Sequence, residues 1–237
     1  MTRRLILLRH GQTEYNATSR MQGQLDTELS ELGKIQAVAA AQILREQNIT
    51  HIYSSDLTRA ARTAAVVAEL VDVEVRTDRR LRETHLGEWQ ARTHQEIDTL
   101  YPGARAQWRH DPQWAPPGGE SRVEVARRAR QLVNELMVSL GDWDRGTVLL
   151  VAHGGTINAL TSNLLELSHE QYPMFSGLGN TCWAQLTARP RYYAGSENPE
   201  EDLKKIPAGG TTPAFNGANI ENAQWYLDGW NVGSTSS

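Results

Sequence analysis

Two histidines follow apolar runs of the chain, and a glycine follows each of them directly. The segment LILLRHG, residues 5–11, leads into Arg9 and His10, and the segment TVLLVAHGG, residues 147–155, leads into His153. An unprotonated imidazole nitrogen is a nucleophile and a proton acceptor, and a guanidinium binds the oxygens of a phosphate or carboxylate. Glycine at the next position lets the backbone approach a bound anion closely. This repeated pattern predicts a site that binds and attacks an anionic group.

Two further segments carry charged residues with the same potential. SSDLTRA, residues 54–60, places Arg59 near the start of an expected helix, and RETHLGEW, residues 82–89, places Glu83 on a loop that contains glycine. Arg9 and Arg59 can hold one tetrahedral anion between them, and a carboxyl group can give and take a proton. Taken singly, each of these is typical of an ordinary surface residue, so the prediction depends on their meeting in space.

A mostly parallel sheet is the architecture that brings such segments together. Short apolar runs alternate with longer stretches of helical period, which indicates an α/β fold with helices on both faces of a central sheet, a three-layer sandwich. In such sheets the ligand crevice lies beyond the carboxyl ends of the strands, so His10 and His153 are expected to meet there. The expected strands are Arg4–Leu8, His51–Tyr53, Val73–Arg76, Thr147–Ala152, Cys182–Leu186 and Trp225–Asp228.

Five helices are expected between these strands. One starts from Ser30 as its N-cap, and another spans Leu57–Leu70 with Ser55 or Asp56 as its cap; the others are Thr93–Leu100, Arg122–Leu140 and Thr156–Leu167. The apolar period of the first helix predicts a buried face. That face is made of Leu32, Ile35, Val38, Ala39 and Ile43.

Length and composition fit one domain spanning residues 1–237. The segment 101–121 is rich in Pro, Gly and Trp and is expected to be a structured loop or lid, whereas the long polar segment 189–223 is expected to be a mobile insertion. A formal net charge of -4 gives no general attraction to nucleic acid or an anionic membrane, and neither is expected as a partner. Any anion must therefore be held by a local cluster of cations.

Cysteine usage and the N-terminus predict a compartment. The single cysteine, Cys182, excludes an internal disulfide and a thiolate zinc site. The apolar run Leu5–Leu8 is shorter than the core of a signal peptide, so a cytoplasmic location is expected. Two histidines and a carboxylate also form the facial triad of iron sites. Two adjacent arginines would repel such a cation, and neither a metal nor another cofactor is expected.

In this order, the four segments RHGQTEYN, SSDLTRA, RETHLGEW and VAHGG resemble the histidine phosphatase superfamily, which has the phosphoglycerate-mutase-like fold. The resemblance covers residues 3 to 187. It implies that His10 becomes phosphorylated, that Arg9, Arg59 and His153 bind the phosphoryl group, and that Glu83 donates the proton. It also assigns substrate binding to four positions, namely Asn16, Gln22, Gly23 and Gly154.

The chemistry of phosphate esters accounts for these residue types. Two guanidiniums and a histidine offset the charge of a phosphate monoester and stabilise its oxygens during transfer. Beside two guanidiniums, the imidazole of His10 should favour its neutral, nucleophilic form.

Within the superfamily the sequence favours hydrolysis over mutase activity. Mutases follow the catalytic Glu with Arg and supply a downstream Lys, whereas this chain has Thr84 and no Lys between Lys34 and Lys204. RMQGQLDTELSELG, RLRETHLGEWQ, WAPPGGESR and the C-terminal WYLDGWN are similar to segments of the actinobacterial glucosyl-3-phosphoglycerate phosphatases. The resemblance thus implies a small-molecule phosphomonoester as substrate, a sugar-linked phosphoglycerate, and a homodimer.

Several alternatives stay open at this point. A broad-specificity or cobalamin-pathway phosphatase would share the catalytic residues, and a phosphoglycerate mutase or a non-catalytic module that binds phospho-ligands is less favoured. For a sugar substrate, an indole ring can stack on the sugar and a guanidinium can meet the glycerate carboxylate. The candidates for these contacts are Trp89, Trp108, Trp114, Arg92, Arg105 and Arg109.

Overall fold

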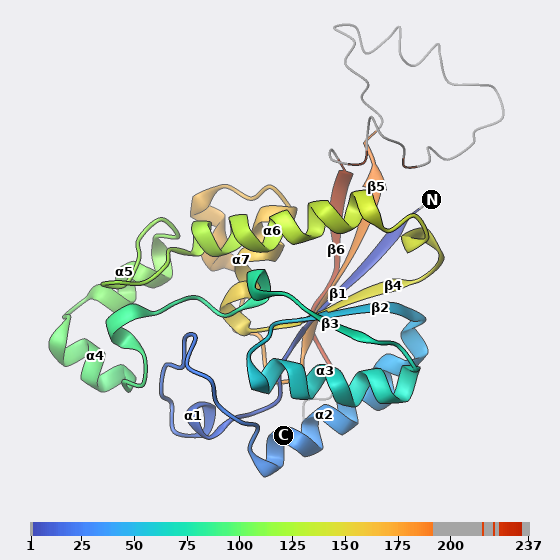
Figure 1. Cartoon of the computed structure of the whole chain (residues 1–237). Coiled ribbons are helices and arrows are strands. Elements are labelled where there is room, and N and C mark those ends of the chain that lie inside the picture. Colours follow the sequence, from blue (N-terminus) through green and yellow to red (C-terminus); the bar gives the residue numbers. More distant parts are fainter. Residues whose placement is uncertain (1, 192–214, 216–219, 221–222, 234–237) are drawn as a thin grey trace, which may run out of the picture.

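A six-stranded sheet runs through the computed structural model, which describes residues 2–191, 215, 220 and 223–233 (Figure 1). The strand order is β3-β2-β4-β1-β5-β6. Strands β1, β2, β3 and β4 are parallel to one another, and β5 and β6 form an antiparallel pair beside β1. The strands are β1 (Arg3–Arg9), β2 (Ile49–Ser54), β3 (Val75–Thr77), β4 (Thr147–Ala152), β5 (Trp183–Pro190) and β6 (Ala223–Val232). The expected mostly parallel sheet is confirmed.

Helices cover both faces of this sheet, as the alternation of segments predicted. Leu5 and Leu7 of β1 pack with α6 and α7, whereas Ile6 and Leu8 pack with α2 and α3. Because both faces are covered, the central strands are continuous apolar runs rather than alternating ones. The helices are α1 (Glu14–Ala17), α2 (Glu31–Leu44), α3 (Thr58–Val71), α4 (His94–Leu100), α5 (Ala104–His110), α6 (Arg122–Ser139) and α7 (Gly154–Leu164). No helix in the described part of the chain is long and apolar enough to cross a membrane.

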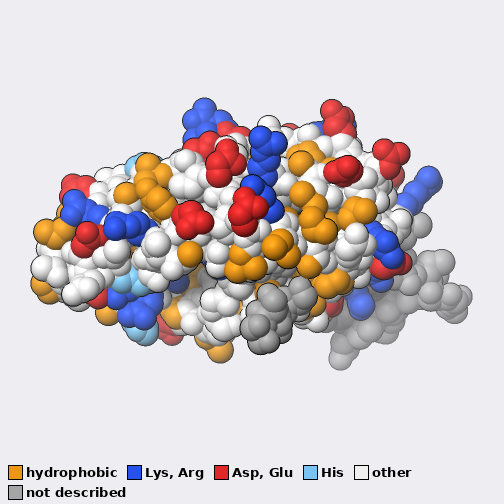
Figure 2. Space-filling view, turned by 90° about the horizontal axis from the view of Figure 1, so that it is seen from below, with side chains coloured by type: hydrophobic (Ala, Val, Ile, Leu, Met, Phe, Trp, Pro, Cys, Tyr) orange, Lys and Arg blue, Asp and Glu red, His pale blue; other side chains and the backbone are white. Residues whose placement is uncertain are grey.

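The predicted buried face of α2 was wrong. All five of its members are exposed, and the face lies on the outer surface, where Figure 2 shows hydrophobic side chains over the α2 side of the molecule. Mostly small residues pack inward instead: Gly33, Ala37, Ala40 and Ala41, with Leu44 at the end of the helix. A Cβ at Gly33 would lie 2.0 Å from the carbonyl oxygen of Gln12, so the helix approaches the chain too closely for larger side chains. The exposed members are Leu32, Ile35, Val38, Ala39 and Ile43.

The cap of α2 was predicted correctly, but that of α3 was not. Ser30 accepts a hydrogen bond from the N–H of Gly33. The N-cap of α3 is Leu57, and the carboxylate of Asp26 from a distant loop accepts from the N–H of Thr58 at 2.7 Å. Asp56 is unable to cap this helix because its carboxylate forms an ion pair with Arg82.

The predictions for the two irregular segments, 101–121 and 189–223, had different outcomes. Segment 101–121 is structured, as expected, and contains the short helix α5, which the sequence did not predict. Of segment 189–223, the ends belong to β5 and β6, since Pro190 pairs with Ala223. The predicted mobile insertion otherwise lies outside the described residues, apart from Phe215 and Ile220.

Candidate active site

The carboxyl ends of the parallel strands bring the two histidines together. Arg9 of β1 pairs with Ala152 of β4, so His10 and His153 leave neighbouring strands at the same level. Their ring centroids lie 5.1 Å apart with an interplanar angle of 59°. A separation of 143 positions in sequence thus becomes a direct contact, as the parallel sheet predicted.

The hydrogen bonds of His10 prepare one ring nitrogen for attack. Its Nδ1 lies 2.6 Å from the carbonyl oxygen of Gly11, which can only accept, so Nδ1 carries the proton. The other nitrogen, Nε2, therefore keeps its lone pair. Burial, with the nearby charges of Arg59 and Arg9, lowers the pKa of His10 well below 6.5. These effects favour the expected neutral form, and burial contributes more to it than the guanidiniums do.

His153 is fully buried beside His10. Its Nε2 lies 2.9 Å from the hydroxyl oxygen of Ser55, at the end of β2. Within the described residues its Nδ1 has no hydrogen-bond partner. Burial lowers the pKa of His153 well below 6.5, and the charge of Arg59 and the adjacent His10 lower it further. Both imidazoles are therefore neutral in the unliganded site at neutral pH.

The two guanidiniums are held by main-chain carbonyls. Arg59 donates to the carbonyls of Leu25 and Gly23, each at 2.8 Å, and Arg9 donates to the carbonyl of Leu178. Burial lowers the pKa of Arg59 to about 10, against the opposing effect of Glu83, so the side chain stays charged at neutral pH. These neutral acceptors fix the guanidiniums without cancelling their charge.

Glu83 occupies the N-terminus of α7. Its carboxylate accepts hydrogen bonds from the N–H groups of Gly155 and Thr156, each at 3.1 Å, and from the N–H of Thr84 at 2.7 Å. The N-terminus of a helix favours a negative charge, so this position suits a carboxylate. The helix was predicted to begin at Thr156 and begins at Gly154, which explains why these N–H groups were not foreseen as partners of Glu83.

The four predicted substrate-binding residues lie around this cluster in different ways. Asn16 and Gln22 line the pocket, together with Arg9, His10, Arg59 and Glu83. Gly23 adopts a left-handed conformation (φ 55°) and binds Arg59 through its carbonyl rather than lining the pocket. A Cβ at Gly154 would lie 3.5 Å from Nε of Arg9, so this glycine adjoins the cation.

Six further residues line the pocket, and of these only Trp108 was a candidate from the sequence. They are Arg20, Met21, Thr84, Leu86, Trp108 and Gly155. Trp108 alone of the three candidate tryptophans lines it; Trp89 is fully buried, and it packs against Trp108 and Trp114.

The arginine of the pocket wall is also different from those predicted. The candidates Arg92, Arg105 and Arg109 do not line the pocket, and Arg105 is paired with Asp98. Arg20 could have been found, because it begins the stretch RMQGQLDTELSELG, whose Gln22 was assigned to substrate binding. In the part of the chain that is described, no group of three His, Cys, Asp or Glu side chains is arranged to hold a metal ion.

Comparison with known proteins agrees with this geometry. Residues 5–194 match the model of the histidine phosphatase superfamily (branch 1). The chain is 49% identical over 241 aligned positions to a glucosyl-3-phosphoglycerate phosphatase of Mycobacterium tuberculosis, covering 99% of this chain and 97% of the relative. It is 50% identical over 235 positions to the protein of the same name from Mycolicibacterium vanbaalenii, covering 97% and 95%.

A solved structure gives the same result. A mycobacterial glucosyl-3-phosphoglycerate phosphatase in complex with VO3 superposes with a TM-score of 0.81 at 48% identity, covering 97% of this chain and 98% of the other. The match extends over nearly the whole length of both chains, and the sequence segments that carry the pocket are those that suggested the family. The chain belongs to the histidine phosphatase superfamily.

Proposed function

We propose that the chain hydrolyses phosphomonoesters through a phosphohistidine intermediate on His10. The observation that carries this proposal is that His10, Arg9, Arg59 and Glu83 line a single pocket, with His153 packed against His10 directly behind it. The guanidiniums of Arg9 and Arg59 offset the charge of the phosphoryl oxygens.

The proposed reaction has two steps. In the first, Nε2 of His10 attacks phosphorus, the bond to the leaving oxygen breaks, and Glu83 gives its proton to that oxygen. In the second, Glu83 takes a proton from water, whose oxygen attacks the phosphohistidine and releases inorganic phosphate. The enzyme regains its starting state, because His10 is again free and Glu83 is again protonated.

We propose glucosyl-3-phosphoglycerate as the substrate, with glucosylglycerate and phosphate as products. Full-length relatives of about half identity bear the name of this activity, and one of them binds VO3, an oxyanion of the phosphate type. The pocket adds apolar wall residues, Met21, Leu86 and Trp108, and one further cation, Arg20. The indole ring of Trp108 is the candidate to stack on the sugar. Arg20 is the candidate for the glycerate carboxylate.

A substrate panel tests this assignment. Phosphate release is measured with glucosyl-3-phosphoglycerate, 3-phosphoglycerate, an α-ribazole phosphate and p-nitrophenyl phosphate. We expect kcat/KM to be at least about tenfold higher for the first compound, since several sugar contacts of about 1 kcal/mol each add to the phosphate contacts. Equal values across the panel would indicate a broad-specificity phosphatase instead.

A variant of the nucleophile tests the intermediate. His10→Asn should abolish turnover and prevent the formation of an acid-labile, base-stable phosphoprotein, which the wild type should form when it is quenched during turnover. His169→Asn, which changes an exposed histidine, is the matched control and should leave both unchanged. Turnover by His10→Asn at the wild-type rate would contradict the covalent mechanism.

The setting of the reaction is part of the same proposal. One sheet includes strands from Arg3 to Val232, which supports a single domain over residues 1–237. The free, buried thiol of Cys182 supports the cytoplasm as the compartment. The homodimer that the resemblance implies is tested by light scattering of the purified protein.

A further inference from the structure

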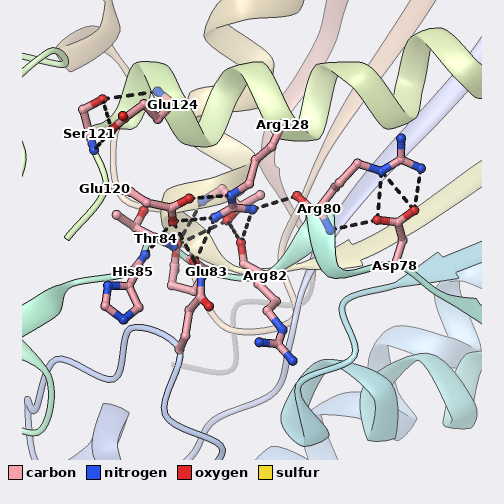
Figure 3. A network of polar contacts seen from close by, with 12 residues as sticks. Asp78, Arg80, Arg82, Glu83, Thr84, His85, Glu120, Ser121, Glu124 and Arg128 are labelled. Carbon is pink, nitrogen blue, oxygen red and sulfur yellow. Dashed lines mark hydrogen bonds and ion pairs between the residues drawn. The ribbon is translucent and has the colours of Figure 1, made fainter. Parts of the chain in front are cut away.

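Arg128 of α6 uses every N–H of its guanidinium on the segment that carries Glu83 and on Glu120 (Figure 3). One terminal nitrogen donates to the carbonyls of Arg80 and Arg82, each at 2.7 Å. The other donates to the carbonyl of Glu83 at 2.9 Å and to the carboxylate of Glu120 at 3.0 Å. Its Nε donates to the second oxygen of Glu120 at 2.9 Å.

Glu120 completes the attachment from the other side. One of its carboxylate oxygens accepts from the N–H of His85 at 2.8 Å, in addition to its bond with Arg128. The amide nitrogen of Gln24 donates to the carbonyl of Glu83 at 3.1 Å. Burial raises the pKa of Glu120, but the hydrogen bonds from Arg128 and His85 outweigh it, and the pKa lies below its usual range. The ion pair is therefore present throughout the neutral range.

The segment needs this support because it has no regular structure of its own at Glu83. A single 3₁₀ turn, Arg79–Leu81, ends just before it, and a second one begins at Gly87. Between them the carbonyls of Arg82 and Glu83 and the N–H groups of Thr84 and His85 have neither helix nor sheet partners, and side chains bind them instead. Arg128 and Glu120 do so from α6 and from the loop before it, which are joined to the core. The carboxylate end of Glu83 is fixed by α7, and its main chain is fixed by this pair.

We propose that Arg128 and Glu120 are positioning residues that hold the main chain of Glu83 so that its carboxyl group reaches the leaving oxygen of the substrate. This inference rests on the proposed function, in which Glu83 is the proton donor. A planar, five-donor guanidinium can make these contacts together, whereas the ammonium of lysine, with three donors, cannot. Neither residue lines the pocket, so the pair acts on the substrate indirectly, through the position of Glu83.

The leaving group of the substrate separates positioning from general structural damage. An alkyl phosphate needs a proton on its leaving oxygen, whereas p-nitrophenolate leaves without one because it is a weak base. We use kcat/KM, which reports the steps up to transfer of the phosphoryl group to His10. Glu83→Gln sets the reference: it should lower kcat/KM for an alkyl phosphate by about 10² to 10⁴ and for p-nitrophenyl phosphate by less than about threefold.

Arg128→Lys should reproduce this selectivity in weaker form. We expect a loss of about 10- to 100-fold for the alkyl phosphate and less than about threefold for p-nitrophenyl phosphate, since a displacement near 1 Å costs up to about 10²-fold. Glu120→Gln, which keeps the shape of the side chain, should show the same pattern. If Arg128→Lys does not fold, the result with Glu120→Gln alone tests whether the pair positions Glu83. Arg80→Gln is the control, because the Arg80 side chain pairs with Asp78 and Glu135 instead. It should change neither value by more than about twofold.

Two results would overturn the inference while leaving the proposed function intact. One is an equal loss for both substrates in Arg128→Lys and Glu120→Gln, which would indicate only a scaffolding role. The other is wild-type activity of both variants on the alkyl phosphate. Failure of Glu83→Gln to discriminate between the substrates would instead refute the role of Glu83, and with it the premise of the proposal.

Discussion

Gly155→Ala is expected to displace the proposed proton donor without unfolding the protein. A Cβ at this position would lie 2.5 Å from Oε1 of Glu83 and 3.1 Å from the hydroxyl oxygen of Thr84. Ordinary contact begins at 3.4 Å, so the carboxylate must move by at least 0.9 Å. It would lose or weaken its hydrogen bonds from Gly155 and Thr156. Displacements near 1 Å cost up to about 10²-fold in rate, and we expect a loss of about 30- to 100-fold in kcat/KM for an alkyl phosphate.

The expected effect on stability is small, which makes the variant informative. Alanine is favoured over glycine in a helix by about 1 kcal/mol, and the atom that must yield is the end of a flexible side chain. We therefore expect the free energy of unfolding, measured by denaturant titration, to change by no more than about 1 kcal/mol. Gly154→Ala is the matched comparison, since its methyl group meets Nε of Arg9 at an ordinary 3.5 Å and its N–H is kept. We expect it to lose less than about threefold. If Gly155→Ala is as active as Gly154→Ala, the carboxylate position of Glu83 does not matter for the reaction and the reasoning fails.

Four other predictions follow from the site and its supports. Because the pKa values of His10 and His153 are lowered, both stay neutral below pH 6.5, and kcat/KM should not fall as the pH passes from 7.5 to 6; a titration midpoint near 6.5 on the acid side would contradict this. In the unfolded chain the same histidines bind protons below about 6.5, so the free energy of unfolding should fall by about 3 kcal/mol between pH 7.5 and 5.5; His153→Gln, followed by denaturant titration, should remove about half of that dependence. Trp108→Ala should raise KM for glucosyl-3-phosphoglycerate by about three- to tenfold and leave KM for 3-phosphoglycerate unchanged. Trp114→Ala is the control, because Trp114 does not line the pocket, and an equal rise of KM in both variants would exclude stacking by Trp108. Asp26→Ala removes the side-chain cap of α3 and should lower the free energy of unfolding by about 1 kcal/mol and the Tm by about 2 to 4 °C; an unchanged thermal melt would show that the cap contributes nothing.

The central part of the site could be predicted because one local pattern occurs twice. The His-Gly pair marks the carboxyl end of each apolar strand, and the carboxyl ends of parallel strands lie at the same edge of a sheet. His10 and His153 therefore needed only the fold class to be placed together. The segment with Arg59 follows β2 in the same way, so Arg59 was placed by the same argument, whereas the place of Glu83 on a loop followed only from the resemblance to the family.

The outer wall of the pocket was predicted only in part, because its residues come from irregular segments. Trp108 was one of three candidate tryptophans, but it lies on α5, a seven-residue helix inside a stretch whose prolines and glycines indicate a loop, so the sequence did not single it out. The cap of α3 comes from Asp26, which is 32 positions from Thr58 in sequence, and no local pattern reveals such a contact.

The orientation of α2 failed for a different reason. Two stripes of its sequence have the period of a helix, one of large aliphatic residues and one of Gly and Ala. Hydrophobicity favours the large residues, but the space between the helix and the Gln12 segment admits only the small ones. Periodicity gives the number of candidate faces, and packing distance decides between them.

Neutral histidines change how the site accepts a charged ligand. Because neither His10 nor His153 is protonated, the positive charge that meets a phosphate dianion comes from the guanidiniums of Arg9, Arg20 and Arg59, which stay charged across the neutral range. The affinity for an anion of fixed charge should therefore not depend on the protonation of either imidazole. Sulfate, which remains a dianion in this range, should accordingly inhibit equally at pH 7.5 and at pH 6.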